Sequence, residues 1–521
     1  AALEKMVAQG RESVSFPLEF PELFLCAEDG DGGFDAVVGN PPWDTLTAKS
    51  KEWLAGVDIG VLDGNSREFE RKKNAILVDE TIKRGFEDYL FSFDALKRTN
   101  DRLYEYQKVF VHDDLAGRFL DSFRVFMERN AQLTKRRGFT GVIVPSAFHA
   151  NAGATGVRRL YLEKMALKTC FSFENRKKLF DIHASFKFAA VVAEKSLRRT
   201  DEFDCGFYLL TPDVLFRPDD KFLMRYPLQF IKNFDPDYLA MLELSGPASL
   251  KQIVTIQTSQ TLGQARRQAG ISFSTSELNL TKDHQRLSDL PPNWGNLSPA
   301  DQLQEAILGR LFPVFEGKSV HQYNDCFEGG PTMCAAWGAL ADRPHWYEAV
   351  RYFRLGYRKI ASSTNERTAI WSLLPLLAVT AESFPSERIP LERPNVLALK
   401  LLATMNSFVA DYLLRLRVAA TVNLFILDST PLPSVPKSGM VEAFLAHAAL
   451  RLTCNHAGYE ALWREQLDDV WRESTPKNTW PVLADDSSRW TVRAAVDAVV
   501  AEAYGLDRSQ YQHILSSFSH K

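Results

Sequence analysis

The sequence predicts an α/β fold for the first part of the chain, and three observations lead to this prediction. Short apolar runs rich in valine, such as residues 34–39, are typical of buried parallel strands. Patterns of helical periodicity alternate with such runs as far as about residue 195. Beyond about residue 225, short mixed segments replace the alternation, and the last part is helical by pattern. We therefore predict an α/β domain over residues 1–225, an α+β domain over 226–435 and a helical extension over 436–521.

Composition limits where the protein works and what it binds. The chain has 521 residues, a formal net charge of −3 and 45% hydrophobic residues, as is usual for soluble globular proteins. This net charge carries no nucleic-acid signature, so any DNA-binding surface must be a local patch. The six cysteines form no CxxC pair and no cluster with histidine, which argues against a metal site and for a reducing compartment. No signal peptide or membrane-spanning run is recognisable, so we expect a cytoplasmic protein without membrane contact.

The first strand runs into the tetrapeptide Asn40-Pro41-Pro42-Trp43. Prolines cannot continue a ladder of backbone hydrogen bonds, so the strand must stop there and the chain must turn. In an open α/β sheet, the carboxyl end of a strand is where ligands bind. The sequence thus places an amide, a conformationally fixed carbonyl group and an indole at a predicted active-site position. The alternative is a plain strand that ends in a proline turn.

The tetrapeptide resembles motif IV, in its NPPW form, of the DNA amino-methyltransferases. Those enzymes transfer a methyl group from S-adenosylmethionine to an exocyclic base nitrogen. The resemblance implies that the side-chain oxygen of Asn40 and the carbonyl of Pro41 accept the two hydrogens of an adenine amino group, with Asn40 also near the cofactor. Pro41 and Pro42 fix φ and so hold that carbonyl in place. Trp43 is expected to stack on a base extruded from the duplex.

The next predicted elements are helical. Residues 44–110 are charged and aromatic, with helical periodicity from Ser66 to Tyr89. In the family this stretch often closes over the substrate, and a solvated helical insertion is the alternative. Residues 112–115 are expected to cap an amphipathic helix that passes through Phe119 and Met127.

A turn at residues 135–138 and an apolar strand at 139–145 follow this helix. Helix, turn and strand together resemble motifs V and VI of the same family. The resemblance places Phe119 near the cofactor, although an apolar residue at such a position is also typical of a core.

The alternation continues with a predicted helix at residues 157–165 and a strand at 186–192. The segment FENRKKLFDIHASFKFAAVV, residues 173–192, resembles the last catalytic-domain segment of these methyltransferases. There, an aromatic residue on a strand is expected to contact the edge of the flipped base. Phe188 is the first candidate and Phe186 the second, and a plain core phenylalanine is the competing interpretation.

The middle of the chain carries cations and amides interleaved with aromatic residues. After a polar tract at 282–301, predicted as a loop or linker, come FEGKSVHQY, YRKIASSTNERT, MNSFVADYLLRLRV and NLFILDSTPLP. These segments resemble the target-recognition region of the same methyltransferases, and their residue types suit phosphates and base edges. A solvated basic face is the alternative, with Arg367 paired to a carboxylate across the fold. The residues expected to contact DNA are Lys318, His321, Gln322, Arg358, Lys359, Asn365 and Arg367.

The combined resemblance, which includes the lead-in FPLEFPELF, is to large adenine methyltransferases of type IIG restriction–modification systems, with relatives in BREX and DISARM phage defence. It implies a partial Rossmann-like class I methyltransferase domain, a target-recognition domain, S-adenosylmethionine as cofactor and double-stranded DNA as partner. The family's cofactor motif, FxGxG after a strand, is missing ahead of Phe34, and residues 327–330 follow no predicted strand.

We therefore expect a fragment or one half of a split enzyme. Its partner would be an amino-terminal cofactor-binding or nuclease part, or another subunit of a defence system. A DNA-specificity module without catalysis is the alternative. The absence of a Pro-Cys dipeptide argues against the cytosine carbon-5 mechanism, and no phosphate-binding loop of the GxxxxGK[ST] type is present.

Overall fold

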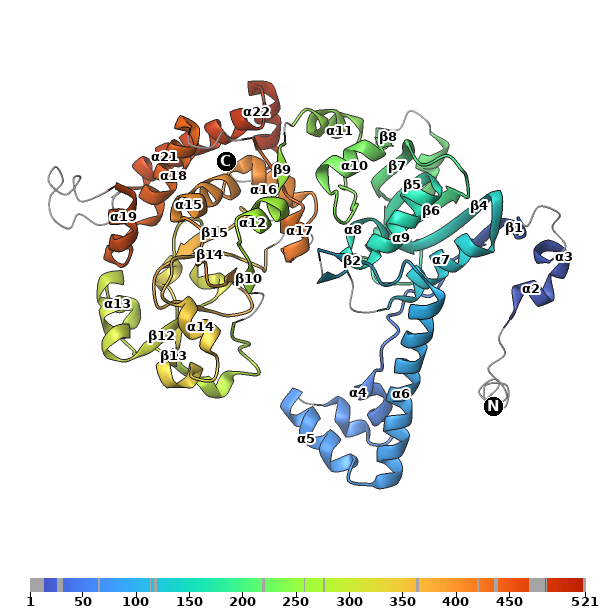
Figure 1. The fold of residues 1–521 in the computed structure, drawn as a ribbon, viewed down its shortest axis with the longest axis horizontal. Helices are drawn as coiled ribbons and strands as arrows, with labels where there is room; N and C mark the ends of the chain where they lie inside the picture. The colour runs from blue at the N-terminus through green and yellow to red at the C-terminus, as the bar shows by residue number, and fades with distance from the viewer. Residues whose placement is uncertain are drawn as a thin grey trace. The chain divides into compact units, whose positions relative to one another are not determined.

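The structure is a computed structural model, and its described residues form two compact units, residues 1–250 and 251–521 (Figure 1). The described residues are 14–25, 31–63, 66–112, 114–116, 120–217, 221–256, 258–274, 277–361, 365–418, 421–434, 439–467, 483 and 485–518. Both units mix helices and sheets, as the predicted α/β and α+β composition requires.

The first unit is built on a six-stranded sheet. The order of its strands is β1-β4-β6-β5-β7-β8. Two pairs are parallel, β1 with β4 and β5 with β7, and the other neighbours are antiparallel. The strands are β1 (Phe34–Gly39), β4 (Thr134–Pro145), β5 (Ala166–Glu174), β6 (Lys187–Glu194), β7 (Glu202–Leu209) and β8 (Leu223–Pro227).

Side chains alternate between the two faces of this sheet, so that each face packs against a different set of residues. Helices α7 (Ser122–Leu133), α8 (Ala147–Ala150) and α9 (Thr155–Arg159) pack near β4 and β5. On β6, Val191 is fully buried, whereas its partly buried neighbour Ala190 packs against a buried cluster that contains Phe173 and Phe188. The alternation follows from the two-residue period of a strand, and the aromatic cluster carries the candidate site.

Two expectations about the strands need correction. The strand at 34–39 is parallel to β4 as predicted, but it is not buried: Val38 is 82% exposed, and in the described part of the chain only β4 pairs with β1. The predicted turn at 135–138 is a bulge inside β4, because Phe34 pairs with Thr134 while Ala36 pairs with Phe139. The physical reason for the first error is that burial of a strand depends on neighbours that local sequence does not specify.

The predicted cap of α7 is also wrong. Residues 110–111 and 114–115 form a short antiparallel ladder, β2 (Phe110–Val111) with β3 (Asp114–Leu115). The helix instead begins at Ser122, directly after Asp121. The helical character predicted from Ser66 to Tyr89 is confirmed by α5 (Ser66–Ile76) and α6 (Glu80–Leu103), and α4 (Ser50–Ala55) precedes them. These helices share an apolar cluster of their own, formed by Leu54, Val61, Phe69 and Phe86.

The first unit ends later than the predicted boundary at residue 225. Strand β8 pairs with β7, and α10 (Leu228–Phe234) follows β8 directly. Tyr226 is fully buried and exchanges hydrogen bonds with Leu242: its hydroxyl donates to the Leu242 carbonyl at 3.2 Å and accepts from the Leu242 N–H at 3.0 Å. Segment 228–250 is therefore part of the first unit.

The second unit contains two four-stranded sheets. Their strand orders are β10-β17-β14-β15 and β11-β13-β12-β16. Bounds are β10 (Phe273–Ser274), β11 (Leu287–Asp289), β12 (Leu311–Phe315), β13 (Met333–Ala336), β14 (Arg354–Tyr357), β15 (Trp371–Leu374), β16 (Val379–Thr380) and β17 (Ser386–Glu387). The tract predicted as a linker lies within this unit, since it supplies β11 and the buried Trp294. Its polar residues form an edge strand and turns. Local composition cannot distinguish such a segment from a linker, because both are polar.

Helices complete the second unit. The apolar helix α15 (Asn395–Met405) packs against α18 (Met440–Thr453), and α21 (Asp486–Ala503) contacts α18 and α16 (Phe408–Arg415). The helical pattern predicted for the last part of the chain is confirmed by α18 and α21, but these helices belong to the second unit and are not a separate extension. In the described ranges no single helix is long and apolar enough to cross a membrane; α15 and α16 reach that criterion only as a pair bent by 66°.

Candidate functional site

The predicted site lies at the carboxyl end of β1. Asn40 is exposed, Pro41 is buried and Pro42 is exposed. Because β1 and β4 are parallel and Gly39 pairs with Val142, the tetrapeptide stands at the edge where β4 also ends. The prolines hold the backbone after Asn40 in a fixed direction.

The chain after the tetrapeptide is fastened to the start of α7. The Asp44 carbonyl accepts hydrogen bonds from the N–H and the hydroxyl of Ser122, at 2.9 and 2.8 Å. The Thr45 hydroxyl donates to the Asp121 carboxylate at 2.9 Å, and the Leu46 N–H donates to the Leu120 carbonyl at 2.7 Å. The loop is therefore held at both ends, by β1 and by α7.

Trp43 and Phe188 lie side by side. Their ring centroids are 6.3 Å apart with an angle of 28° between the planes. Phe180 meets Trp43 edge-on at 6.3 Å, and the indole N–H points to the Ile143 carbonyl at 3.4 Å. Trp43 itself is only half-buried, so part of the indole remains open to solvent.

Phe188 lies behind Trp43 in the sheet core. It is 4% exposed, stacks on Phe173 at 5.4 Å and meets Phe180 edge-on at 4.8 Å. A planar ring inserted between Trp43 and Phe188 needs about 7 Å, two contacts of about 3.5 Å each, so the two rings leave no room for a base. Phe188 thus supports Trp43 from within, and the second candidate Phe186 is 53% exposed.

A triad of charged and polar side chains lies close to the same edge of the sheet, and no sequence pattern indicated it. Glu243 accepts hydrogen bonds from His149 at 3.0 Å and from Lys187 at 2.6 Å. Burial alone raises the pKa of Glu243, but the hydrogen bond and charge of His149 and those of Lys187 outweigh it and lower the pKa to about 2. The ammonium of Lys187 also lies 4.6 Å from the centre of the Tyr208 ring. The triad joins the ends of β4 and β6 to segment 228–250.

The residues predicted to contact DNA lie in the second unit and differ in how far solvent reaches them. Lys318 is exposed and pairs with Glu316 at 2.8 Å, Asn365 is exposed, and Lys359 is half-buried. Arg358 is half-buried; its Nη2 donates to the Val320 carbonyl at 2.5 Å, while its Nε has no hydrogen-bond partner among the described residues. These three cations and one amide are at least partly exposed to solvent, so a ligand can reach them.

Gln322 and Arg367 belong to the interior, which corrects their assignment as DNA contacts. Arg367 is 5% exposed, and it donates to the Asp411 carboxylate at 2.7 Å and to the Asn406 carbonyl at 2.5 Å. Gln322 is 3% exposed and donates to the carbonyls of Ala369 and Asn406 at 2.7 and 3.3 Å. Their polar atoms are used inside the fold, so the alternative of a buried ion pair holds for Arg367.

His321 is half-buried beside several guanidinium groups. Burial and the charges of Arg358, Arg493 and Arg367 lower its pKa to about 4. The imidazole is therefore neutral near pH 7 and supplies no positive charge for a phosphate. Its ring lies 4.8 Å from that of Phe327, which makes it a packing partner rather than a phosphate ligand.

The described residues do not form a complete site for S-adenosylmethionine. Of the two residues predicted near the cofactor, Asn40 is exposed at the end of β1, and Phe119 lies outside the described residues. In the described part of the chain, no glycine-rich loop follows a strand on the free side of β1. The described residues therefore supply the hydrogen-bond acceptors, Asn40 and Pro41, and the aromatic ring of Trp43, but no complete cofactor site.

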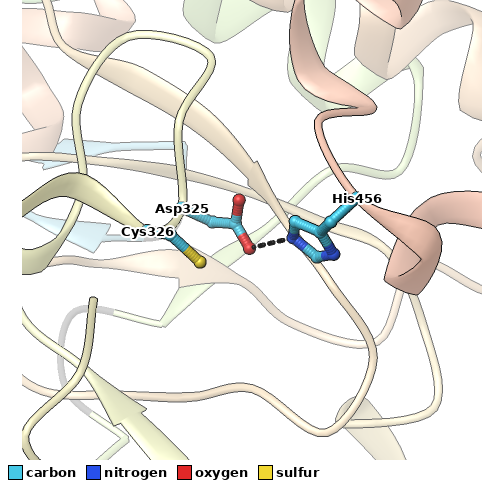
Figure 2. A group of neighbouring side chains, drawn as sticks. All are labelled: Asp325, Cys326 and His456. Atoms are coloured by element: carbon cyan, nitrogen blue, oxygen red, sulfur yellow. Dashed lines mark hydrogen bonds and ion pairs between the residues drawn. The ribbon is translucent and has the colours of Figure 1, made fainter. Parts of the chain in front are cut away.

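One cluster contradicts the expectation that no cysteine lies near a histidine. Asp325, Cys326 and His456 meet in the second unit, with ligand atoms that all lie within 4.8 Å of one another (Figure 2). The sequence separation of His456 from the other two hides this cluster from any search for spaced motifs.

No model of a known protein family matches the sequence, and no curated protein matches it. Several solved structures are similar in part. The type IIL restriction-modification enzyme MmeI in complex with DNA is 11% identical over 77% of this chain and 52% of its own, with a TM-score of 0.37. A nuclease-deletion mutant of the type ISP restriction-modification enzyme LlaGI is 10% identical over 85% of this chain and 44% of its own, also with a TM-score of 0.37. The DrdV–DNA complex is 10% identical over 82% of this chain and 45% of its own, with a TM-score of 0.36. The chain spans about half the length of these proteins.

Proposed function

We propose that this chain is the base-binding and target-recognition part of a site-specific DNA methyltransferase that acts on adenine N6, within a restriction–modification or phage-defence system. One observation supports this most: Asn40 stands exposed at the end of β1, three residues before an indole that stacks on Phe188. The half-buried indole of Trp43 is the ring that an extruded base can reach, whereas the buried Phe188 supports it from within the sheet core.

Methyl transfer to adenine N6 depends more on hydrogen-bond acceptors than on acidic or basic groups. The lone pair of an adenine N6 amino group is delocalised into the ring, which makes the nitrogen a poor nucleophile. The Asn40 side-chain oxygen and the Pro41 carbonyl accept its two hydrogens and favour a tetrahedral nitrogen. These acceptors are preorganised because the prolines and the contacts of Asp44 and Thr45 fix the loop. The half-buried indole of Trp43 gives the extruded base a face to stack on.

Among the described residues only β4 pairs with β1, and this open edge supports a two-part enzyme. Val38 is 82% exposed, although apolar edge strands are usually paired, covered or protected by charges. We infer that strands which carry the S-adenosylmethionine site pair with β1, either from a further part of the same protein or from another subunit. A DNA-specificity module without catalysis is the second candidate, because the described residues alone lack a cofactor site.

The test is methyl transfer to duplex DNA by the longer protein or by the chain combined with its cofactor-binding partner. Asn40→Ala should lower the rate by about 10²–10³, the usual cost of removing one preorganised polar group from an active site, and should leave DNA affinity unchanged. Asn233→Ala, which changes an exposed asparagine on α10, is the matched control. An Asn40→Ala enzyme with more than about a tenth of the wild-type rate would contradict the proposal.

A further inference from the structure

The strongest unexplained group of side chains lies in the second unit. Asp325 and Cys326 follow β12, whereas His456 follows α18. Figure 2 shows the three side chains pointing toward one another. Asp325 is 2% exposed and His456 6% exposed, so this is an interior cluster and not a solvated acidic surface.

The hydrogen bonds leave the charge of Asp325 uncompensated. The Gly458 N–H donates to His456 Nδ1 at 3.1 Å, so the ring is neutral and carries its proton on Nε2. Nε2 donates that proton to Asp325 Oδ2 at 2.9 Å. The other oxygen, Oδ1, is buried without a hydrogen-bond partner among the described residues. A buried carboxylate that has no cationic partner is costly, and a cation beside it would remove that cost.

The three side chains share a small cavity. Its volume is about 30 Å³, and its other walls are largely apolar, with Trp294, Leu303 and Phe315 among them. One water molecule needs roughly 10–15 Å³ of such space. The cavity can therefore hold a metal-bound water without a larger opening.

We propose that Asp325, Cys326 and His456 bind a divalent metal ion of the zinc type, with a water from the cavity as fourth ligand. Carboxylate oxygen, thiolate sulfur and imidazole nitrogen are the donors that zinc takes in proteins. Bond lengths of about 2.0–2.3 Å put tetrahedral donors roughly 3.3–3.8 Å apart. Donor atoms that lie within 4.8 Å of one another reach this arrangement through side-chain shifts of about 1 Å.

Binding has a defined proton balance. The thiol of Cys326 loses its proton to solvent when its sulfur bonds to the metal ion. The imidazole stays neutral, and its proton moves from Nε2, which becomes the ligand, to Nδ1. The Gly458 N–H then faces a second donor, so this 3.1 Å contact has to lengthen. One proton is released for each ion bound.

The ion would join two distant parts of the second unit. Asp325 and Cys326 belong to the segment that links β12 and β13, and His456 belongs to the connection between α18 and α19 (Glu460–Leu467). An ion that binds only the folded state raises the melting temperature with its concentration. Metal binding at this cluster requires neither methyl transfer nor the proposed function.

Cobalt(II) is the probe that tests the site, because thiolate ligation gives a charge-transfer band in the near ultraviolet. The metal-stripped full chain should bind one equivalent of Co²⁺ with this band and should release it to one equivalent of Zn²⁺. Cys326→Ser should lose the band and weaken Zn²⁺ binding by about 100-fold or more, since even outer-shell changes cost 10–100-fold. The matched control is Cys334→Ser, a buried cysteine on β13 outside the cluster, which should keep the band.

A second variant tests whether a loss of metal binding results only from misfolding. Asp325→Asn keeps the shape of the side chain and removes its charge, so it should melt at the same temperature as wild type in EDTA or above it, yet gain nothing from Zn²⁺. Wild type should melt several degrees higher with Zn²⁺ than in EDTA. A wild-type chain without the cobalt band, or a band that survives Cys326→Ser, would overturn the proposal.

Discussion

At the scale of single residues, His321 shows how neighbours decide what a side chain can do. Its position among basic and aromatic residues suggested a DNA contact, but burial and three arginines lower its pKa to about 4. The neutral ring lies beside Phe327 and leaves positive charge to Arg358 and Lys359. No local pattern of residues could reveal this, because Arg493 comes from a helix far along the chain.

The lowered pKa has a consequence for stability. Between pH 4 and 6.5 the unfolded chain binds a proton at His321 that the folded chain does not bind, so the free energy of unfolding rises with pH in this window. We expect His321→Gln to lose that contribution, as measured by chemical denaturation across the same pH range. Asp497, whose pKa burial raises to about 6, acts in the opposite direction in both proteins, so the difference between them reports on His321. Equal pH dependence in the two proteins would contradict the assignment.

The aromatic pair shows what sequence could and could not predict at this scale. Trp43 and Phe188 were both expected near the base, and the structure places them in contact. The sequence could not tell which of them reaches solvent, because exposure depends on Phe173 and Phe180 from other segments. The triad of His149, Lys187 and Glu243 stayed hidden for the same reason.

At the scale of elements, buried ion pairs fix how segments join. Arg367, in the chain before β15, pairs with Asp411 on α16. We expect Arg367→Met to lower the free energy of unfolding by about 3 kcal/mol or more, because it leaves a buried carboxylate with fewer partners. Lys318→Met removes a solvent-exposed ammonium from its pair with the half-buried Glu316 and should cost less, about 1 kcal/mol. Denaturation of both variants at one pH gives the comparison, and equal losses would contradict the burial of Arg367.

The free edge of β1 makes a prediction about assembly. Val38→Asp should leave the stability of the isolated chain nearly unchanged, because the side chain is 82% exposed. It should abolish association with the cofactor-binding part, since a charge at an edge strand prevents pairing. Val57→Asp, at a 47% exposed position in the helical insertion, is the matched control. Co-purification measures the outcome, and full association of Val38→Asp would mean that β1 is not the joint.

The periodicity of apolar residues predicted where the helices lie, but it did not predict which segments pack around them. The residues expected to be helical from Ser66 to Tyr89 fall in α5 and α6, and the helical pattern of the last part is present in α18 and α21, because apolar spacing is local information. The start of α7 was missed because residues 110–115 pair with each other as strands. The edge position of β1 and the ordered tract at 282–301 were missed because both depend on partners distant in sequence.

At the scale of the whole molecule, a chain with net charge −3 needs a local cationic surface to hold DNA. Lys359 and Arg358 are the cations predicted from sequence that stay accessible without an ion-pair partner among the described residues. We expect Lys359→Ala to weaken binding to all duplexes alike and to reduce the slope of log affinity against log salt by about one unit. A salt series with purified chain and duplex DNA measures this, and an unchanged slope would place the DNA elsewhere.

Trp43 is proposed to receive an extruded adenine, and the fluorescence of 2-aminopurine at the methylated position reports this contact. Wild type and Trp43→Phe should both change the fluorescence of the bound duplex, because either ring can stack on the base. Trp43→Ala should weaken extrusion by about 1–3 kcal/mol and leave overall DNA affinity largely intact. A fluorescence response of Trp43→Ala equal to that of Trp43→Phe would contradict the claim.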